Sequence, residues 1–248
     1  MSLSIAVVAD IHGNIEALDA ALLDIATHQP DRLFIAGDLV MNGPRPSEVV
    51  QRVMALERAG AYVVQGNTDI AVADGDYTAA YPWLDEVSPQ QRQAAEWAAD
   101  QLTPDELDYL RRLPAERRLW VGQTLVLLCH ASPGSQTAGL ATDLDGPTLV
   151  QRVTRSDARV IVCGHTHVAD VRELGRKLIV NPGSCGYAFD DDPGAAWAML
   201  TLEADAEPVA ELHRVAYDAE RVAVEVSDRQ LPGDVYRAAT IRKGRLVR

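Results

Sequence analysis

Side chains that can bind metal ions gather at the ends of short apolar runs in this 248-residue chain. Four of its six histidines stand there, together with two aspartates and one asparagine. The set comprises Asp10, His12, Asp38, Asn67, His130, His165 and His167. Carboxylate, amide and imidazole donors without a thiolate suit Mn²⁺, Fe or Zn²⁺ and argue against a cysteine-rich structural zinc site. Seven groups are too many for one ion but enough for two ions that share a carboxylate, and paired ions can stabilise both oxygens of a displacement at phosphorus.

The segment IVCGHTHVAD, residues 161–170, places His165 and His167 one residue apart after an apolar run. Alternate side chains of an extended backbone project to the same side, so we expect both imidazoles to face the metals and Thr166 to point away. Gly164 would let the backbone approach the site closely, because glycine has no Cβ. Taken alone, the segment fits a pair of ordinary loop histidines equally well.

The elements that must position these residues alternate along the first third of the chain. Apolar runs predict strands at residues 4–10, 31–38 and 61–67, and helix-period segments predict helices at 14–30 and 46–60. This alternation is typical of parallel strands joined by right-handed crossovers. Open α/β sheets bind ligands at the carboxyl ends of their strands, which is where the donors stand.

The rest of the chain predicts a helical insertion and a second set of strands. Ser88-Pro89 and Thr103-Pro104 are helix-start signals, and they place two helices in an insertion at residues 68–114. The elements expected after it are hairpins at 117–130 and 169–184, a helix at 146–157, and strands at 158–165, 195–204 and 208–218. A C-terminal extension at about 218–248 contains a helix at 219–229 and a basic tail without defined structure. We expect one domain over 1–248, with two packed sheets and helices outside them.

The charge balance disfavours some classes of partner. The chain has 23 basic and 36 acidic side chains, a formal net charge of −13, so long nucleic acid and anionic membranes are unfavourable partners. A small phosphorylated substrate is compatible with this charge, since a bound metal ion reverses the local field. The three cysteines form no CxxC pair, and the N-terminus has no secretory signal pattern. We therefore expect a cytoplasmic protein without a membrane-spanning segment.

The ordered blocks D-x-H, G-D, G-N, H and G-H-x-H resemble those of the calcineurin-like metallophosphoesterase superfamily. The segments GDLVMNGPRPSEV and NPGSCG are similar to its small bacterial phosphodiesterase-type branch, and the resemblance extends over roughly residues 4–203. It implies an α/β fold, a four-layer α/β/β/α sandwich of two mixed sheets flanked by helices. It also implies one ion at Asp10, His12, Asp38 and His167, and a second at Asp38, Asn67, His130 and His165, with Asp38 bridging.

The activity that the resemblance implies is that of a dinuclear metal-dependent phosphoesterase. Metal-activated hydroxide would attack phosphorus in a small phosphodiester or a related phosphate compound. The alternatives are a phosphomonoesterase, a dinucleoside polyphosphate hydrolase, or a protein-binding scaffold with a vestigial site. All seven donors are present, which favours an enzyme over a scaffold. The sequence leaves the oligomeric state open.

The chain departs from the family pattern at Thr68, where many relatives have a histidine assigned to protonate the leaving group. A hydroxyl is a poor proton donor, so Thr68 predicts a preference for good leaving groups such as aryl or anhydride oxygens. The alternative is that other relatives also lack this histidine and that Asp69 or a water molecule takes its place. Together with Asp38 and Asn67, Asp69 completes the predicted catalytic set.

A second departure follows NPGS, where the branch often has a basic residue and this chain has Tyr187 and Phe189. With Trp83 and Trp97, these rings could line a pocket for a nucleobase, although packing in the core is the simpler explanation for all four. The candidate substrate contacts are Asn42, Thr68 and Arg45. For Arg45, an exposed loop arginine without such a role is the simpler interpretation.

Overall fold

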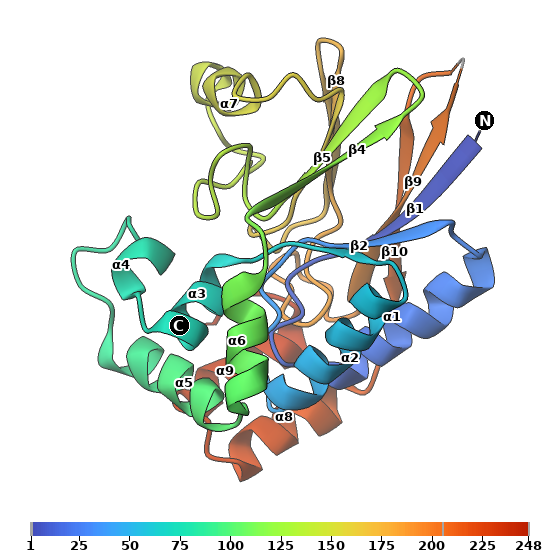
Figure 1. Ribbon diagram of the computed structural model, residues 1–248. Helices are drawn as coiled ribbons and strands as arrows, with labels where there is room; N and C mark the ends of the chain where they lie inside the picture. The colour runs from blue at the N-terminus through green and yellow to red at the C-terminus, as the bar shows by residue number, and fades with distance from the viewer. Residues whose placement is uncertain (1, 205, 248) are drawn as a thin grey trace.

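The computed structural model describes residues 2–204 and 206–247, and its strands form two five-stranded sheets (Figure 1). The first sheet has the strand order β10-β9-β1-β2-β3. Its strands are β1 (Ser2–Val8), β2 (Arg32–Ile35), β3 (Tyr62–Val63), β9 (Ala195–Glu203) and β10 (Val209–Val215). The strands β1, β2 and β3 pair in parallel, and β9 joins β1 in the antiparallel direction. This is a mixed sheet, as predicted.

The second sheet has the strand order β4-β5-β6-β8-β7. Its strands are β4 (Glu116–Val121), β5 (Thr124–Cys129), β6 (Val160–Val162), β7 (Asp170–Leu174) and β8 (Lys177–Asn181). The three central strands are parallel, and β4 and β7 are antiparallel hairpin partners at the two edges. The carboxyl ends of the parallel strands in both sheets therefore deliver their loops to the same end of the molecule.

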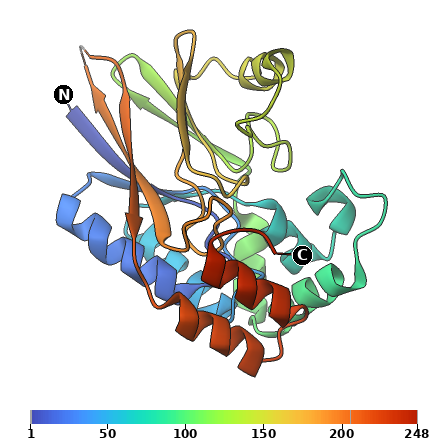
Figure 2. The same cartoon turned by 180° about the vertical axis from the view of Figure 1, so that it is seen from behind.

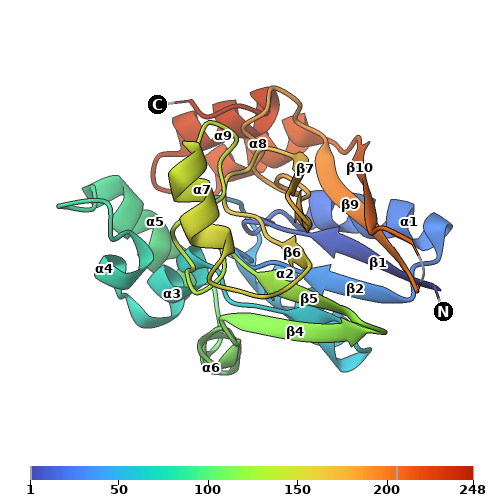
Figure 3. The ribbon, with the colours of Figure 1, turned by 90° about the horizontal axis from the view of Figure 1, so that it is seen from above.

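The helices surround the two sheets and, in the described part of the chain, none combines the length and the apolar character needed to cross a membrane. Their bounds are α1 (Ile15–His28), α2 (Pro46–Arg58), α3 (Asn67–Asp74), α4 (Tyr77–Ala80), α5 (Pro89–Asp100), α6 (Pro104–Arg112), α7 (Gly146–Val153), α8 (Ala219–Asp228) and α9 (Asp234–Lys243). The helices α1 and α2 pack on the first sheet, and α8 and α9 lie beside them (Figure 2). The helix α7 lies over the opposite, outer face of the second sheet (Figure 3).

The alternation of side chains along β1 separates the layers. Ile5 and Val7 face the second sheet in the core between the sheets, whereas Ala6 and Val8 face the helices. All four are fully buried, because a strand whose two faces are both covered has no polar side. A third cluster joins the outer face of the second sheet to α7. The four-layer α/β/β/α sandwich is confirmed.

The insertion contains more helix than its cap signals predict. The two predicted helices are present as α5 and α6, whose caps Ser88 and Thr103 accept hydrogen bonds from the backbone N–H groups three residues later. Two further helices, α3 and α4, precede them. The third predicted strand, at residues 61–67, is wrong in length, because only Tyr62–Val63 pairs with β2 and α3 begins at Asn67.

The expectation of an unstructured basic tail is also wrong. The helix α9 occupies Asp234–Lys243 and buries Ala238, Thr240 and Ile241. Its end carries the usual helix-stop signals, with Arg242 and Lys243 in the last turn and a left-handed Gly244 after them. The sequence contains these signals, but the apolar residues of this segment do not follow a clear helical period, so the pattern does not predict the helix.

Candidate metal centre

The predicted donors lie on loops that follow β1, β2, β5 and β6, except Asn67, which is the first residue of α3 after β3. Most of these loops hold an unusual backbone. Five donors have positive φ angles between 52° and 69°: Asp10, His12, Asp38, His165 and His167. Such angles are uncommon for residues other than glycine and cost roughly 1–3 kcal/mol each, so they persist only where the surroundings impose them. The extended backbone predicted for the HTH segment is therefore wrong. A turn, and not strand alternation, directs its two imidazoles.

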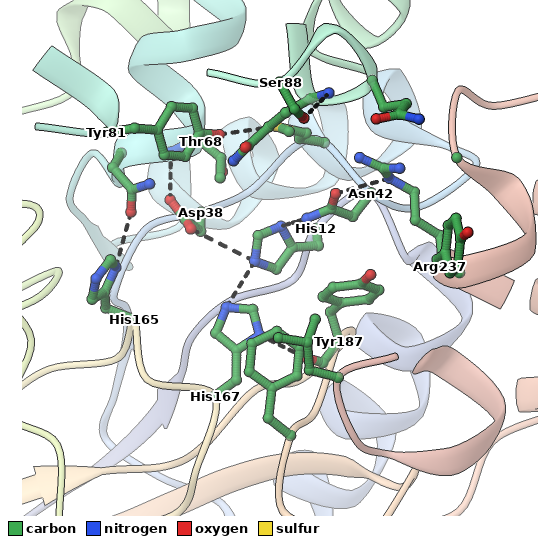
Figure 4. Close-up of a pocket in the computed structure, with 18 of the residues that line it drawn as sticks. His12, Asp38, Asn42, Thr68, Tyr81, Ser88, His165, His167, Tyr187 and Arg237 are labelled. Carbon is green, nitrogen blue, oxygen red and sulfur yellow. Dashed lines mark hydrogen bonds and ion pairs between the residues drawn. The ribbon is translucent and has the colours of Figure 1, made fainter. Parts of the chain in front are cut away.

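The first cluster of donors combines two carboxylates and two imidazoles, and Figure 4 shows three of its members, His12, Asp38 and His167. One ligand atom from each of Asp10, His12, Asp38 and His167 lies within 4.8 Å of the others, and all four residues are buried. His12 Nε2 is 3.1 Å from His167 Nε2 and 3.6 Å from Asp38 Oδ2. His167 Nε2 is 3.5 Å from Asp10 Oδ1. This geometry can hold a divalent cation.

The second cluster of donors is centred on Asn67. Its Oδ1 atom lies 3.0 Å from His130 Nε2 and 2.9 Å from His165 Nδ1. His130 Nε2 is also 3.4 Å from Asp38 Oδ1, so the two carboxylate oxygens of Asp38 face different clusters. Within the HTH turn, His165 thus joins the second cluster and His167 joins the first.

The histidine rings are oriented by backbone carbonyls. His130 Nδ1 donates a hydrogen bond to the Ala36 carbonyl oxygen at 2.7 Å, and His167 Nδ1 contacts the Tyr187 carbonyl oxygen. A proton held at Nδ1 leaves Nε2 with a free lone pair, which is the form that binds a metal. Both rings therefore present a ligand atom to the centre.

Burial sets the ionisation of the centre. It raises the pKa of Asp10 well above its usual range, with repulsion from Asp38 as the next cause, and it raises the pKa of Asp38 to about 7. Burial also lowers the pKa of His130 to about 4 and those of His165 and His167 to about 3. Asp10 Oδ1 is buried without a hydrogen-bond partner among the described residues. Neutral imidazoles beside crowded carboxylates, one with an unpaired oxygen, fit bound cations well.

Two glycines allow the carboxylates to approach the backbone. A Cβ on Gly66 would overlap both Asp38 Oδ1 and the Asp38 backbone nitrogen, and a Cβ on Gly164 would lie 2.6 Å from Asp10 Oδ2. Neither glycine has a positive φ. Glycine is therefore required at both positions because a Cβ would collide with a carboxylate, and the sequence predicts such a close approach at Gly164.

The structure gives Asp69 a role in holding two loops together. Asp69 Oδ1 accepts a hydrogen bond from Leu39 N at 2.9 Å, and Oδ2 accepts one from Gly66 N at 2.8 Å. Both oxygens are thus engaged, and the residue is fully buried. Its position does not favour the predicted substitution of Asp69 for the leaving-group histidine. It ties the loop after β2 to the loop after β3.

Thr68 is buried in contact with the same loops. Its backbone nitrogen donates to Asp38 Oδ1 at 2.9 Å, and its hydroxyl donates to the Val40 carbonyl oxygen at 3.1 Å. The backbone contact to Asp38 is available to any residue at this position. The hydroxyl is committed to the backbone, which agrees with the expectation that it does not act as the proton donor.

The two clusters open into a cavity of about 550 Å³, a size typical of small-molecule sites. We call its donor side the cavity floor: His12, Asp38, Asn67, His165 and His167. We call the side formed by helices and their connections the cavity rim: Tyr81, Trp83, Tyr236 and Arg237. Asn42, Thr68, Tyr187 and Phe189 also line the cavity. His130 and Asp10 lie behind the floor, fully buried.

Two side chains proposed from the sequence are turned elsewhere. Arg45 donates from Nε to Glu225 Oε1 at 2.7 Å and so is held against α8. Trp97 lies beneath the guanidinium of Arg229, whose Cζ is 5.3 Å from the ring centroid. Sequence reasoning missed Arg237, because it belongs to the tail that was expected to lack structure.

Comparisons with known proteins place the chain among phosphoesterases. The family model described as the calcineurin-like phosphoesterase superfamily domain matches residues 3–205. An uncharacterized protein of Methanocaldococcus jannaschii is 27% identical over 243 residues, which cover 92% of this chain and 93% of the relative. The crystal structure of a metallophosphoesterase from Sphaerobacter thermophilus is 27% identical, with a TM-score of 0.75, and covers 98% of this chain and 100% of its own. A hypothetical protein from Pyrococcus horikoshii OT3, 20% identical, has the same fold with a TM-score of 0.82 over 98% of this chain and 99% of its own.

Proposed function

Because this chain belongs to the calcineurin-like phosphoesterase superfamily, we propose that it is a dinuclear metal-dependent phosphoesterase acting on a small phosphodiester or related phosphate compound. The position of Asp38 carries the proposal. Its Oδ2 atom lies 3.6 Å from His12 Nε2 in the first cluster, and its Oδ1 atom lies 3.4 Å from His130 Nε2 in the second. A carboxylate between two sets of donors is the shared ligand that a pair of ions requires.

We assign each donor to one of the two ions according to the cluster in which it makes its contacts. Asp10, His12, Asp38 and His167 would hold the first ion, and Asp38, Asn67, His130 and His165 would hold the second. The mixture of oxygen and nitrogen donors supports Mn²⁺, Fe or Zn²⁺ as the ions. When bound, such ions lower the pKa of water towards neutrality and neutralise charge on phosphoryl oxygens.

The protein prepares this chemistry through its own residues. Burial keeps the imidazoles of His130, His165 and His167 neutral at physiological pH, so they bind cations without first losing a proton. The Ala36 carbonyl fixes the ring of His130 and directs Nε2 to the second cluster. Asp69 holds the loops that carry Asp38 and Asn67 at a fixed separation.

The environment of Thr68 supports a preference for good leaving groups. Its hydroxyl donates to Val40, and both oxygens of Asp69 accept backbone hydrogen bonds. Neither side chain is placed to protonate a departing oxygen. General acid catalysis contributes about 10²–10⁴-fold to rate, so esters of weakly acidic alcohols should be hydrolysed more slowly than aryl esters by about that factor.

We also propose that the protein works in the reducing environment of the cytoplasm. Cys129, Cys163 and Cys185 are all buried as free thiols. Burial raises the pKa of Cys129 and Cys185 well above the usual range and that of Cys163 to about 12, so their reactive thiolate forms are scarce.

Metal analysis combined with a substrate panel tests the proposed function. The protein is loaded with Mn²⁺, Fe²⁺ or Zn²⁺, the bound ions are counted by mass spectrometry, and turnover is measured on bis(p-nitrophenyl) phosphate, p-nitrophenyl phosphate and a dialkyl phosphate. We expect two ions per chain, the highest rate on the aryl diester and the lowest on the dialkyl ester.

The substitution Asp38→Asn supplies the decisive variant for this test. It should remove at least one ion and nearly all turnover, whereas Asp143→Asn, which changes an exposed loop carboxylate, should change neither. Unchanged turnover in Asp38→Asn would contradict the bridging role. Binding of a single ion with full activity would contradict the dinuclear assignment.

A further inference from the structure

The guanidinium of Arg237 lies in the cavity and has no carboxylate partner among the residues that the structure describes. Among the described residues that line the cavity, Arg237 is the only lysine or arginine. Its Nε donates to Asn42 Oδ1 at 3.1 Å and its Nη1 donates to the Pro232 carbonyl oxygen at 2.5 Å. Within residues 2–204 and 206–247, no carboxylate oxygen lies within 4.0 Å of it and no acceptor is bonded to Nη2. The guanidinium therefore keeps donors directed to the cavity.

Several other partly buried arginines of this protein have acidic partners, although Arg152, which is also partly buried, bonds within the described chain only to the Gly139 carbonyl oxygen. Arg45 and Arg214, for example, are 30% and 21% exposed and pair with Glu225 and Asp190. Arg237 is also half-buried, but its partners in the described chain are an amide and a backbone carbonyl. Removing a guanidinium from water is costly unless an anion compensates it. A partly desolvated arginine facing an open cavity is thus suited to an anionic ligand.

The fold provides space for this side chain. Gly233, the residue before α9, has a φ of 76°, and a Cβ there would overlap Arg237 Nη1. The guanidinium then reaches Asn42, and Asn42 Nδ2 lies 3.2 Å from His12 Nδ1 (Figure 4). Arg237 is thereby connected through one side chain to the first donor cluster. An anion bound at the ions would lie within the same cavity as the guanidinium.

Two exposed aromatic rings complete the cavity rim. Trp83, in the connection after α4, is 54% exposed, and Tyr236, in α9, is 50% exposed. Both line the cavity, from segments far apart in the chain. Single exposed rings are common on protein surfaces, and Trp120 is 64% exposed outside the cavity. Trp83 and Tyr236 differ from it because both line the cavity that holds the donor clusters. Rings at the mouth of a polar cavity offer flat apolar faces to a planar group.

We propose that Arg237, Trp83 and Tyr236 form a substrate-binding subsite for phosphate esters whose organic group is aromatic. The guanidinium binds a negatively charged oxygen of the ester, and the two rings hold the planar group at the cavity mouth. The inference rests on the proposed function, which places the phosphoryl group at the donor clusters. It goes beyond that function because it names the organic part of the substrate and assigns three residues to its recognition.

Binding of two non-hydrolysable ligands separates the roles of charge and ring. Phenylphosphonate and methylphosphonate share the anionic group and differ in the ring, and calorimetry gives their affinities for the Mn²⁺-loaded protein. Arg237→Gln should weaken both ligands by about 10- to 100-fold, because hydrogen bonds to charged groups are lost for each. Trp83→Ala and Tyr236→Ala should weaken phenylphosphonate alone, by about 3- to 10-fold each.

Matched variants make the test decisive. Arg242→Gln removes the same charge from the same helix at a surface pair with Glu220 and should leave both affinities unchanged. Arg237→Lys keeps the charge but loses the planar fork, so it should retain part of the affinity; it also carries the test if Arg237→Gln does not fold. Equal binding by Arg237→Gln and wild type would overturn the anion role. Equal affinity of the wild type for the two ligands would overturn the aromatic role.

Turnover distinguishes failure of this inference from failure of the proposed function. Wild-type protein that hydrolyses bis(p-nitrophenyl) phosphate but binds phosphonates independently of Arg237 would overturn the subsite alone. Wild-type protein that binds phenylphosphonate through Arg237 but shows no turnover on any phosphate ester would overturn the hydrolytic function and leave the binding site standing.

Discussion

The donors of the cavity floor stand at or near the carboxyl ends of strands, whereas the side chains of the cavity rim come from helices and connections outside both sheets. Neighbouring loops of the floor are joined by backbone hydrogen bonds, such as Asp10 N to the Gly37 oxygen at 3.1 Å and Gly164 N to the His130 oxygen at 2.7 Å. The rim is held to the floor by side chains, as Arg237 is held by Asn42. A backbone network fixes ligand positions closely, as metal chemistry requires, and side-chain packing leaves the rim free to differ between relatives.

This contrast agrees with the extent of the family match. The match covers residues 3–205, which include every donor of the floor. They also include Tyr81 and Trp83, the two rim residues that belong to the helical insertion. Arg237 and Tyr236 lie beyond the match. We infer that the floor determines the class of reaction and that the C-terminal helices adjust what enters the cavity.

The largest effect should come from filling the space beside Asp38 that Gly66 leaves open. In Gly66→Ala the added Cβ overlaps Asp38 Oδ1 and its backbone nitrogen, and the φ of Gly66 is −95°, which alanine adopts readily. We expect turnover to fall by more than about 100-fold, since changes that only touch the partners of metal ligands cost 10–100-fold. Metal content and turnover are the measurements. Gly146→Ala is the control, because a Cβ there meets nothing within 4 Å; normal ion content in Gly66→Ala would contradict the role of this contact.

A smaller effect should follow from cutting the link between floor and rim. Asn42 joins His12 to Arg237 by contacts of 3.2 and 3.1 Å. Asn42→Ala should lower phosphonate affinity by about 10-fold, because Arg237 loses the acceptor that holds its Nε. Asn42→Asp retains an acceptor for Arg237 but introduces an anion. If it weakens phosphonate more than Asn42→Ala does, the guanidinium is the group that the ligand needs.

Much of the floor could be predicted from the sequence because its geometry is dictated by topology. Each donor follows an apolar run, and the carboxyl ends of parallel strands meet at one edge. Two features were hidden. The positive φ angles of Asp10 and His165 are uncommon for any residue other than glycine, and no turn signal in the sequence marks them. Asp69 gives no sign in the sequence that both of its oxygens accept backbone hydrogen bonds.

The rim could not be predicted because it depends on contacts between distant segments. Arg237 and Asn42 are 195 residues apart in the chain, and neither belongs to a pattern that indicates their contact. Trp83 and Trp97 were equivalent as sequence features, yet one lines the cavity and the other packs under Arg229. Only the packing of α4 and α5 separates them.

The crowded carboxylates of the floor should make the stability of the metal-free protein depend on pH. Burial raises the pKa of Asp38 from its ordinary 3.8 to about 7, so the folded state holds a proton that the unfolded chain has lost. Stability is therefore present at low pH and is lost as the pH rises through the folded pKa. Between pH about 6.5 and about 8.5 the contribution of Asp38 to this loss is about 1 kcal/mol. The donor histidines act in the opposite sense near pH 6.5, because they are neutral in the folded state while the unfolded chain still binds protons near the ordinary histidine pKa of 6.5. The difference in pH dependence between wild type and Asp38→Asn therefore isolates the carboxylate.

Urea unfolding in the presence of a chelator measures this dependence. Saturating Mn²⁺ should remove the loss, because bound cations keep Asp38 ionised in the folded state. Asp38→Asn without metal should also reduce it, since the titrating group is gone. The same pH dependence in wild type and Asp38→Asn without metal would show that Asp38 is ionised in the folded state without cations, contrary to its burial.

The smallest effect should come from Arg45, which the sequence places next to the donors and the structure turns away from them. Its Nε pairs with Glu225 on α8, and both side chains are partly exposed, at 30% and 21%. Exposed ion pairs contribute less than about 1 kcal/mol, so Arg45→Gln and Glu225→Gln should each lower the free energy of unfolding by less than that amount. Turnover and phosphonate affinity should remain as in the wild type, in contrast to Arg237→Gln.

A marked loss of phosphonate affinity in Arg45→Gln alone would indicate that the loop arginine reaches the ligand. A loss shared by Glu225→Gln would indicate that α8 positions α9. Comparing Arg45 with Arg237 thus tests whether proximity to the donors in the sequence or position in the fold determines which arginine binds the substrate.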